Sequence, residues 1–354
     1  MSRNSMRSVG RTWSFGSAIF IVSCCGVVDP VAASDFFSGK QMQIVVSTEA
    51  GTTYDIYARK LAEHMSKYIP GKPKIIVQNM PGAAGLKVAN YIYNVAPKDG
   101  TVIGATHGSV PTAALLSQDG AQYESAKLSW LGSITKEPFV GYIWHTAPAK
   151  KWADLYTTEV TMGTQAVGSA SADYAILANA LLGTKVKNVF GYKSAPEVRL
   201  AIERGEIMGG FGTAYSALRS QAGDWLRDKK ISIFIQHSLT KHPDFPDVPL
   251  FVDQARNDDD RRLLEVILSR QETGKPYFLP PGIPADRLSI LRKAFDDTMK
   301  DSAFVDVLQK ASLEVSDPMT GQEMEAMVGR LMSTPKATVD RIGKIFEDFK
   351  NAPN

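Results

Sequence analysis

Cysteine is almost absent from this sequence: Cys24 and Cys25 are the only two, and both lie near the N-terminus. If the segment that holds them is removed, no disulfide can form, and core packing alone must hold the fold together. The sequence also lacks an excess of charge of one sign, because its formal net charge is only +3. Nucleic-acid binding requires a strongly basic face, so the composition argues against a nucleic-acid partner.

Beyond the N-terminal segment, the chain has no apolar run long enough to span a membrane. That segment contains arginines, then an apolar stretch, then small residues: Arg3, Arg7 and Arg11, residues 13–28, and residues 31–33. This order predicts a secretory signal peptide over residues 1–33 and a periplasmic location for the rest. Two alternatives stay open: the apolar stretch remains as a membrane anchor, or cleavage before Cys24 leaves a lipid-anchored N-terminus.

Short apolar runs alternate with longer amphipathic segments through the remaining chain. The runs that we interpret as buried strands lie at residues 44–46, 75–77, 102–104, 140–144, 160–162, 207–211 and 231–235. Such alternation is typical of parallel-sheet α/β units. An extended segment at 271–282 interrupts the helical pattern and indicates a crossing between two lobes.

We therefore expect an α/β fold of two lobes with a ligand cleft between them. The expected division is lobe 1 at residues 40–142, lobe 2 at residues 143–268, and a crossing strand with C-terminal helices that return to lobe 1 at residues 269–354.

Two corners between a strand and a helix are candidate binding loops. The first, TEAGTTYD at residues 48–55, leads into a helix that Thr52 and Asp55 are expected to cap. Free N–H groups at a helix N-terminus attract anions, but one glycine and no lysine exclude a phosphate loop or a dinucleotide fingerprint. The second corner is GTQAVGSAS at residues 163–171. Because ligands in open α/β sheets bind at the carboxyl ends of strands, two facing corners are expected to clamp one small molecule.

Signatures of catalysis and of metal binding are missing from the sequence. There is no Gly-x-Ser-x-Gly elbow, no His-Glu-x-x-His motif and no cysteine nucleophile after the leader. Ser169 or Ser171 would need a base that the sequence does not place, so a periplasmic hydrolase stays only as an alternative. His237 and His242 lack a carboxylate at ligand spacing, and we expect neither a metal nor a cofactor.

Six segments carry a resemblance to a known family. They are IVVSTEAGTTYDIYAR (44–59), NMPGAAG (79–85), APKDG (96–100), YKSAP (192–196), PDVP (246–249) and PPGIP (280–284). In this order, across almost the whole mature chain, they resemble the substrate-binding proteins of tripartite tricarboxylate transporters, the Bug or TctC-like extracytoplasmic solute receptors. Each segment alone is a weak signal, and their shared order makes the match specific.

The resemblance implies a monomeric, hinge-closing binding protein, not an enzyme, that captures a small organic carboxylate for an integral-membrane transporter. A binding protein that feeds a sensor kinase is the alternative. In the family, main-chain N–H groups and hydroxyls of one loop per lobe hold the carboxylate. Carried over by position, the ligand-binding residues are Glu49, Ala50, Gly51, Thr52, Thr53 and Tyr54 in the first loop, Gly163, Thr164, Gly168, Ser169 and Ser171 in the second, and His107, Ser109 and Tyr192 around the cleft.

Four residues depart from the family pattern. Glu49 stands where relatives usually have a small residue, Thr52 where they have a second glycine, Asp173 where many have histidine, and Tyr54 where they have threonine or serine. Two carboxylates beside an anion site conflict electrostatically. Either they point away and serve the helix termini, or one of them meets an amino or hydroxyl group of the ligand. Tyr54 favours a ligand with an apolar or aromatic body.

Overall fold

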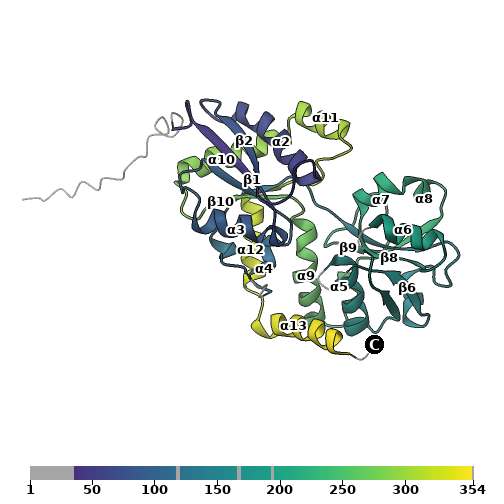
Figure 1. Cartoon of the computed structure of the whole chain (residues 1–354). Helices are drawn as coiled ribbons and strands as arrows, with labels where there is room; N and C mark the ends of the chain where they lie inside the picture. The colour runs from purple at the N-terminus through teal and green to yellow at the C-terminus, as the bar shows by residue number, and fades with distance from the viewer. Residues whose placement is uncertain (1–35, 117–119, 166–168, 193–194, 353–354) are drawn as a thin grey trace, which may run out of the picture.

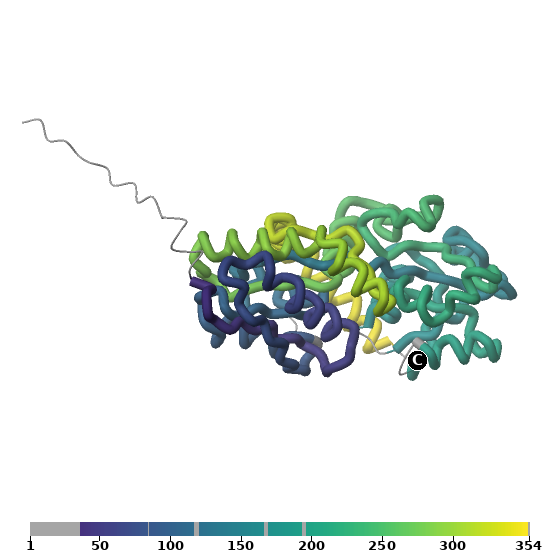
Figure 2. Tube along the Cα trace, turned by 90° about the horizontal axis from the view of Figure 1, so that it is seen from above, coloured from purple at the N-terminus to yellow at the C-terminus, as the bar shows by residue number. Residues whose placement is uncertain are grey.

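The computed structural model describes residues 36–116, 120–165, 169–192 and 195–352 (Figure 1). The predicted signal peptide, Cys24 and Gly168 lie outside the described residues. The described chain forms two lobes that lie side by side, each built around a sheet with helices packed on it (Figure 2). Among these residues, none of the helices combines the length and the apolar character that a membrane crossing needs.

Lobe 1 contains a six-stranded sheet with strand order β11-β4-β10-β3-β1-β2. Its strands are β1 (Gln41–Val46), β2 (Lys74–Asn79), β3 (Val102–Ala105), β4 (Ser129–Ser133), β10 (Pro276–Leu279) and β11 (Met319–Thr320). β1 runs parallel to β2 and β3, whereas β10 is antiparallel to β3 and β4, and β11 is antiparallel to β4. The carboxyl ends of β1 and β3 therefore lie at one edge, where ligand loops are expected.

Helices cover both faces of this sheet. They are α2 (Thr53–Met65), α3 (Leu86–Asn94), α4 (Val110–Ala113), α10 (Ala285–Met299), α11 (Ser302–Lys310) and α12 (Gly321–Met332). Side chains alternate across a strand, so Ile44 and Val46 join the core under α2, α10 and α11, while Val45 joins the core under α3 and α12. A capping box of Thr320 and Glu323 forms at the start of α12.

Lobe 2 contains a five-stranded sheet with strand order β7-β6-β8-β5-β9. Its strands are β5 (Phe139–Trp144), β6 (Val160–Gly163), β7 (Val186–Val189), β8 (Gly209–Ala214) and β9 (Ile231–His237). Its helices are α5 (Ala170–Leu177), α6 (Ala195–Glu203), α7 (Tyr215–Gln221) and α8 (Gly223–Arg227). α5 continues as a π-helical turn that ends at Gly183, whose φ of 73° is the left-handed conformation that favours glycine.

Short helical turns complete the described structure. The 3-10 turns are Ser66–Tyr68, Ala83–Gly85, Ser125–Lys127, Trp152–Tyr156 and Val252–Gln254, and the π-helical turn is Ala178–Leu182.

Within the described residues three chain segments cross between the lobes; two of them are neighbours, and the third, residues 333–335, leads to the last helix. The first, residues 134–138, joins β4 to β5, and the second, residues 273–275, joins α9 (Asp258–Glu272) to β10. They run side by side, because Ile134 N donates to Lys275 O at 3.2 Å and Glu137 N donates to Gln271 O at 2.9 Å. All of β5 belongs to the lobe 2 sheet, so the first crossing comes earlier than the boundary that we expected at residues 142 and 143.

The last helix, α13 (Lys336–Asn351), corrects the expectation that all C-terminal helices return to lobe 1. α13 packs against α5 and α9, and its C-terminal end lies beside lobe 2 (Figure 1). Ile342 on its apolar face is buried, and Arg341 pairs with the buried Asp260 at 2.6 Å. An amphipathic helix must cover its apolar stripe, and α5 and α9 offer the apolar surface that does so.

The two-lobed α/β architecture expected from the sequence is confirmed, and all seven predicted strands overlap observed ones. The expectation of parallel sheets holds only for the groups β1, β2, β3 and β6, β7, β8. The strands next to the first crossing are antiparallel to their neighbours: β4 pairs with β10 and β11, and β5 pairs with β8 and β9. β4 and β7 were not predicted, since serine, lysine and asparagine interrupt their short apolar runs.

Candidate functional site

The first candidate loop is held by its own side chains. Thr52 caps α2: its hydroxyl oxygen accepts a hydrogen bond from Asp55 N at 3.4 Å and the hydroxyl donates to Glu49 O at 2.9 Å. The N–H of Gly51, a residue with φ of 82°, donates to Asp55 Oδ2 at 2.8 Å. Thus only half of the expected capping box forms, because the carboxylate takes the N–H of Gly51 and not that of Thr52.

This arrangement decides which amides of the first loop remain for a ligand. The Gly51 N–H and the Thr52 hydroxyl are occupied inside the loop, which limits their expected role in ligand binding. Thr53 and Tyr54 are the first two residues of α2, and in the described chain no acceptor lies within hydrogen-bonding distance of their N–H groups. Ala50 and Glu49 are exposed at the tip of the loop.

Asp55 fixes the loop in place. It is only 2% exposed and receives hydrogen bonds from Arg59 Nε at 2.9 Å and Asn79 Nδ2 at 2.8 Å, in addition to that from Gly51. Burial by itself would raise the pKa of Asp55, but the hydrogen bonds from Arg59, Gly51 and Asn79 outweigh it and hold the pKa below its ordinary value. The carboxylate is therefore a charged and compensated anchor of the helix start.

Tyr54 connects the first loop to the β3–α4 loop and to the second crossing. Its ring lies against the ring of His107, with centroids 4.7 Å apart, and its hydroxyl lies 3.4 Å from Gly274 O. Lys275 Nζ stands 4.5 Å from the centroid of the same ring. His107 Nδ1 is 3.3 Å from Ser47 Oγ at the end of β1. The two predicted residues Tyr54 and His107 are thus brought together.

The β3–α4 loop is docked tightly on the end of α9. Thr273 Oγ1 donates to Gly108 O at 2.7 Å, and a Cβ at position 108 would lie 2.5 Å from Arg270 O. Only glycine allows this approach. Ser109 is half-buried at the start of α4, where its carbonyl accepts a hydrogen bond from the Thr112 hydroxyl at 3.1 Å.

At the second corner, Gly163 and Thr164 serve the interior of lobe 2. A Cβ at position 163 would lie 2.5 Å from Ile207 Cδ1 and 2.9 Å from Val198 Cγ1, so glycine is required there by packing. Thr164 is fully buried, and its hydroxyl donates to Val189 O at 3.2 Å.

Ser169 and Ser171 stand half-buried at the start of α5. Ser169 is its N-cap and accepts a hydrogen bond from Ala172 N at 3.4 Å, and the two serine hydroxyls are 3.0 Å apart. The N–H of Gln165 donates to Ser171 Oγ at 3.2 Å. Tyr192 packs against the lobe 2 core cluster that contains Val198.

Asp173, one of the two carboxylates that conflicted with an anion site, has a partner of opposite charge. Arg270 of α9 lies 3.1 Å from Asp173, and their side chains are 19% and 7% exposed. Burial by itself would lower the pKa of Arg270, but Tyr174 and Asp173 outweigh it and raise this pKa. Because Arg270 also lies against Gly108, the end of α9 joins the second corner to the β3–α4 loop.

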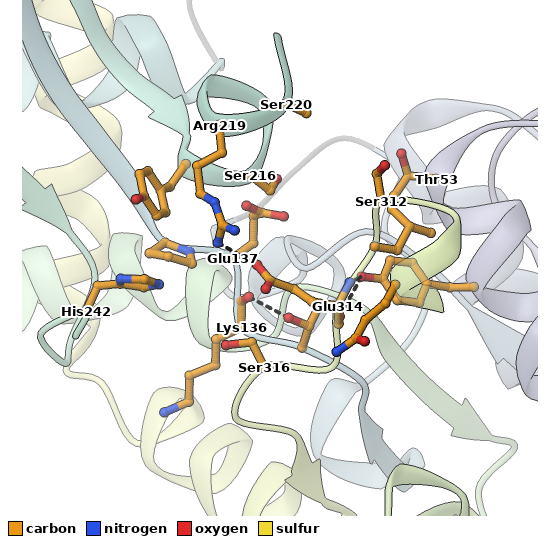
Figure 3. A pocket seen from close by; sticks show the side chains of 16 residues that line it. Thr53, Lys136, Glu137, Ser216, Arg219, Ser220, His242, Ser312, Glu314 and Ser316 are labelled. Carbon is orange, nitrogen blue, oxygen red and sulfur yellow. Dashed lines mark hydrogen bonds and ion pairs between the residues drawn. The ribbon is translucent and has the colours of Figure 1, made fainter. Parts of the chain in front are cut away.

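A cavity of about 540 Å³ opens beside the first crossing, between the lobes (Figure 3). Its lining residues come from both lobes and from the crossing: Thr53, Tyr57, Thr135, Lys136, Glu137, Pro138, Tyr215, Ser216, Arg219, Ser220, His242, Gln309, Ser312, Leu313, Glu314 and Ser316. Of the residues predicted for the site, Thr53 is the one that reaches this lining. The other lining residues were not predicted for the site, because they come from separate segments that share no motif.

Charged groups converge in the middle of this cavity. Figure 3 shows Arg219, Glu137 and Glu314 pointing toward its centre, with Arg219 and Glu314 3.6 Å apart. Lys136 points away, and its Nζ pairs with Glu272 at 3.1 Å.

Tyrosine and lysine side chains stand behind these groups. The hydroxyl of Tyr57 donates to Glu314 O at 2.7 Å and accepts from Glu314 N at 3.2 Å, which fixes the segment that carries Glu314. Lys275 Nζ lies 3.7 Å from Glu137 Oε2, and burial lowers the pKa of this lysine although Glu137 opposes the change. In the described ranges, no group of three or more His, Cys, Asp or Glu side chains is placed to hold a metal ion.

Comparison with known sequences gives two relatives of the same kind. No protein-family model matches the chain. The chain is 22% identical over 282 residues to a UPF0065 protein of Bordetella bronchiseptica, which covers 77% of each protein. It is 31% identical over 160 residues to a UPF0065 protein of Agrobacterium vitis, a match that spans 44% of this chain and 45% of that protein.

Comparison with solved structures concerns the fold. A TctC solute binding protein from Polaromonas without ligand superimposes with a TM-score of 0.66 at 16% identity, covering 86% of this chain and 99% of that one. A Rhodopseudomonas palustris protein with adipate gives 0.57 at 17% identity, with coverages of 87% and 98%. Another from Rhodopseudomonas palustris with bound malate gives 0.55 at 20% identity, with coverages of 88% and 100%. The chain thus has the two-lobed fold of the TctC and Bug periplasmic binding proteins, and its sequence is similar to the UPF0065 proteins, the Bug family.

Proposed function

We propose that this chain is an extracytoplasmic solute-binding protein that captures a small organic carboxylate between its lobes. Its shared fold with the TctC and Bug proteins supports this function, and the two Rhodopseudomonas palustris structures that it resembles hold adipate and malate. The cavity between the lobes is the place where a solute of that size fits.

One observation carries the proposal: Thr53, the first residue of α2, lines the interlobe cavity with its N–H available. A helix N-terminus carries a partial positive charge, which stabilises a partly buried anion by up to about 2 kcal/mol. Charge-assisted hydrogen bonds contribute about 1.5 to 3 kcal/mol each, and Arg219 on the facing lobe adds a full positive charge. These contributions together support micromolar binding after the cost of association.

Closure of the lobes follows from the position of the cavity. α2 and α11 of lobe 1 and α7 of lobe 2 all contribute to its lining, and within the described chain short segments connect the lobes at residues 134–138, 273–275 and 333–335. A solute that contacts both lobes binds the closed form more tightly, and this difference in affinity drives closure.

The proposed setting is the periplasm, where the protein is a monomer that delivers its solute to the membrane subunits of a tripartite tricarboxylate-type transporter. The leader at residues 1–33 supports export, with lipid attachment at Cys24 as the alternative start of the mature chain. The chain leaves lobe 1 through β4 and returns through the adjacent, antiparallel β10, an arrangement that suits a hinge.

A thermal-shift screen of the mature protein tests the ligand class. A ligand that binds only the native state raises the melting temperature by mass action. Organic acids, amino acids and neutral sugars are compared at equal concentration, and we expect shifts only with carboxylates. Shifts confined to neutral sugars would overturn the assignment.

Replacement of Thr53 by proline tests the helix N-terminus directly. Proline is well accepted at the first helical position and removes only the N–H, and the extended conformation of Thr52, with φ of −73° and ψ of 162°, suits a residue before proline. We expect Thr53→Pro to weaken carboxylate binding by about tenfold or more, the equivalent of one charge-assisted hydrogen bond. Thr53→Ala keeps the N–H and is the matched control. Equal dissociation constants for the two variants would show that this amide does not hold the ligand.

A further inference from the structure

We propose that the solute is dipolar: besides its carboxylate it carries an ammonium group, which Glu137 and Glu314 recognise in the interlobe cavity. This inference rests on the proposed function and names the class of carboxylate that the site selects. It concerns residues that neither the sequence motifs nor the comparisons assign to a site.

The two glutamates have acceptor oxygens that lack close donors. Arg219 is 3.6 Å from Glu314, and Lys275 is 3.7 Å from Glu137. Both distances exceed that of a good charge-assisted hydrogen bond, which is about 2.7 to 2.9 Å. For neither carboxylate group is a shorter side-chain hydrogen bond found within the described chain. A carboxylate accepts several hydrogen bonds, so both have capacity for a ligand that donates.

The arrangement of charges disfavours a solute with two carboxylates. Arg219 is the cation that points into the centre of the cavity, and it faces Glu137 and Glu314 (Figure 3). Lys136 is turned toward Glu272, and Lys275 is 7% exposed, behind Glu137. A second carboxylate in the cavity would therefore lie near two negative charges, those of Glu137 and Glu314, and one exposed positive charge, that of Arg219. An ammonium group would instead lie near two charges of opposite sign.

Aromatic rings strengthen this preference. Tyr57 and Tyr215 both line the cavity, one from each lobe, and Arg219 already stands 5.8 Å from the centroid of the Tyr215 ring. The faces of tyrosine rings attract cations. The cavity thus combines two carboxylates and two tyrosines, a set of groups that suits a primary ammonium, while the N-terminus of α2 suits the carboxylate at the other end of the solute.

Isothermal titration of the mature protein with matched acids tests the inference. Each probe pair has one carbon skeleton with and without the amino group: 5-aminovalerate with valerate, and glutamate with glutarate. We expect the amino form to bind at least about tenfold more tightly in each pair whose length fits the cavity, since one charged hydrogen bond is worth that factor. In the Glu137→Gln, Glu314→Gln double variant, the ratio of the dissociation constant of the plain acid to that of its amino form should fall close to one.

Two further variants keep the test decisive. Glu314→Gln alone changes a side chain that is 51% exposed, so it tests the idea even if the double variant is unstable. Glu347→Gln removes the same charge from the exposed surface of α13 and should leave the ratio unchanged. The inference is wrong if the plain acids bind as tightly as their amino forms. It is also wrong if the ratio of the two dissociation constants is unchanged in the Glu314 variant and in the double variant. In both cases the proposed capture of a carboxylate stands. Failure of every acid to bind would instead overturn the proposed function and, with it, the inference.

Discussion

Arg270 at the end of α9 forms an ion pair with Asp173 in the first turn of α5, the two charged groups lying 3.1 Å apart. This pair compensates the carboxylate that seemed to oppose anion binding at the second corner. It also ties the segment that leads into the second crossing to lobe 2. The same arginine lies against Gly108 of lobe 1, so one residue contacts both lobes.

Loss of the arginine should destabilise the protein strongly. Arg270→Met leaves Asp173, whose side chain is 7% exposed, without its partner, and a buried charge without a partner costs about 3 to 5 kcal/mol. We expect the free energy of unfolding in urea to fall by that amount. The double variant Asp173→Asn, Arg270→Met should recover much of the loss, because it removes both charges. Lys336→Met is the control, since the pair of Lys336 with Asp340 is 86% and 58% exposed and contributes little. A single variant no less stable than the control would contradict this role of the pair.

The contact of Gly108 with α9 gives a second prediction. A Cβ at this position would lie 2.5 Å from Arg270 O and 2.7 Å from Thr273 O, both backbone atoms that cannot turn away. Gly108→Ala should therefore lower the unfolding free energy by about 1 to 3 kcal/mol, the usual range for overpacking. Gly343→Ala in the middle of α13 is the matched control, because nothing lies within 4 Å of its added Cβ. Alanine is a better helix former than glycine, so this control should stabilise by up to about 1 kcal/mol. Similar effects of the two variants would show that the loop yields without strain.

Buried His237 predicts a loss of stability in mild acid. Its ring stacks on Tyr174 with centroids 4.4 Å apart, and neither ring nitrogen has a hydrogen-bond partner within the described residues. Burial lowers its pKa to about 3, whereas the unfolded chain keeps an ordinary value near 6.5. Between these two values the unfolded state binds a proton that the folded state does not. The stability present above pH 6.5 is therefore lost as the pH falls, at about 1.4 kcal/mol per pH unit.

His237→Phe isolates this effect because phenylalanine keeps the aromatic shape and does not titrate. We expect the stability gap between the variant and the wild type to grow by about 2 kcal/mol in favour of the variant from pH 7.5 to pH 5. Urea denaturation at the two pH values measures it. His145→Gln, at an exposed position, should show no such growth. A gap that does not change with pH would mean that His237 does not remain neutral in the fold.

Local sequence signals predicted local structure well. The capping box of Thr320 and Glu323 and the left-handed Gly183 can be read from local sequence, because each depends on residues within a few positions of one another. The first corner was predicted as a helix start, and it is one. Its hydrogen bonds differ because Asp55 is also held by Asn79, a residue from the next strand that local sequence does not bring near.

The candidate site was less predictable for the same reason. Gly163 looked like a loop glycine for a ligand, but Val198 and Ile207, distant in sequence, fill the space where its side chain would be. The cavity joins Glu137 from the crossing with Arg219 of α7 and Glu314 near α11. No spacing rule connects these three residues.

By itself, the sequence determined the alternation of strands and helices, the capped corners and the two-lobed class of fold, because periodicity and capping act within a few residues. Only the tertiary structure decided which corner amides remain available, where α13 packs, and which charges meet in the cavity. Those outcomes depend on contacts between segments far apart in the chain. Their energies arise only after the two sheets have assembled and the crossings have set the lobes side by side.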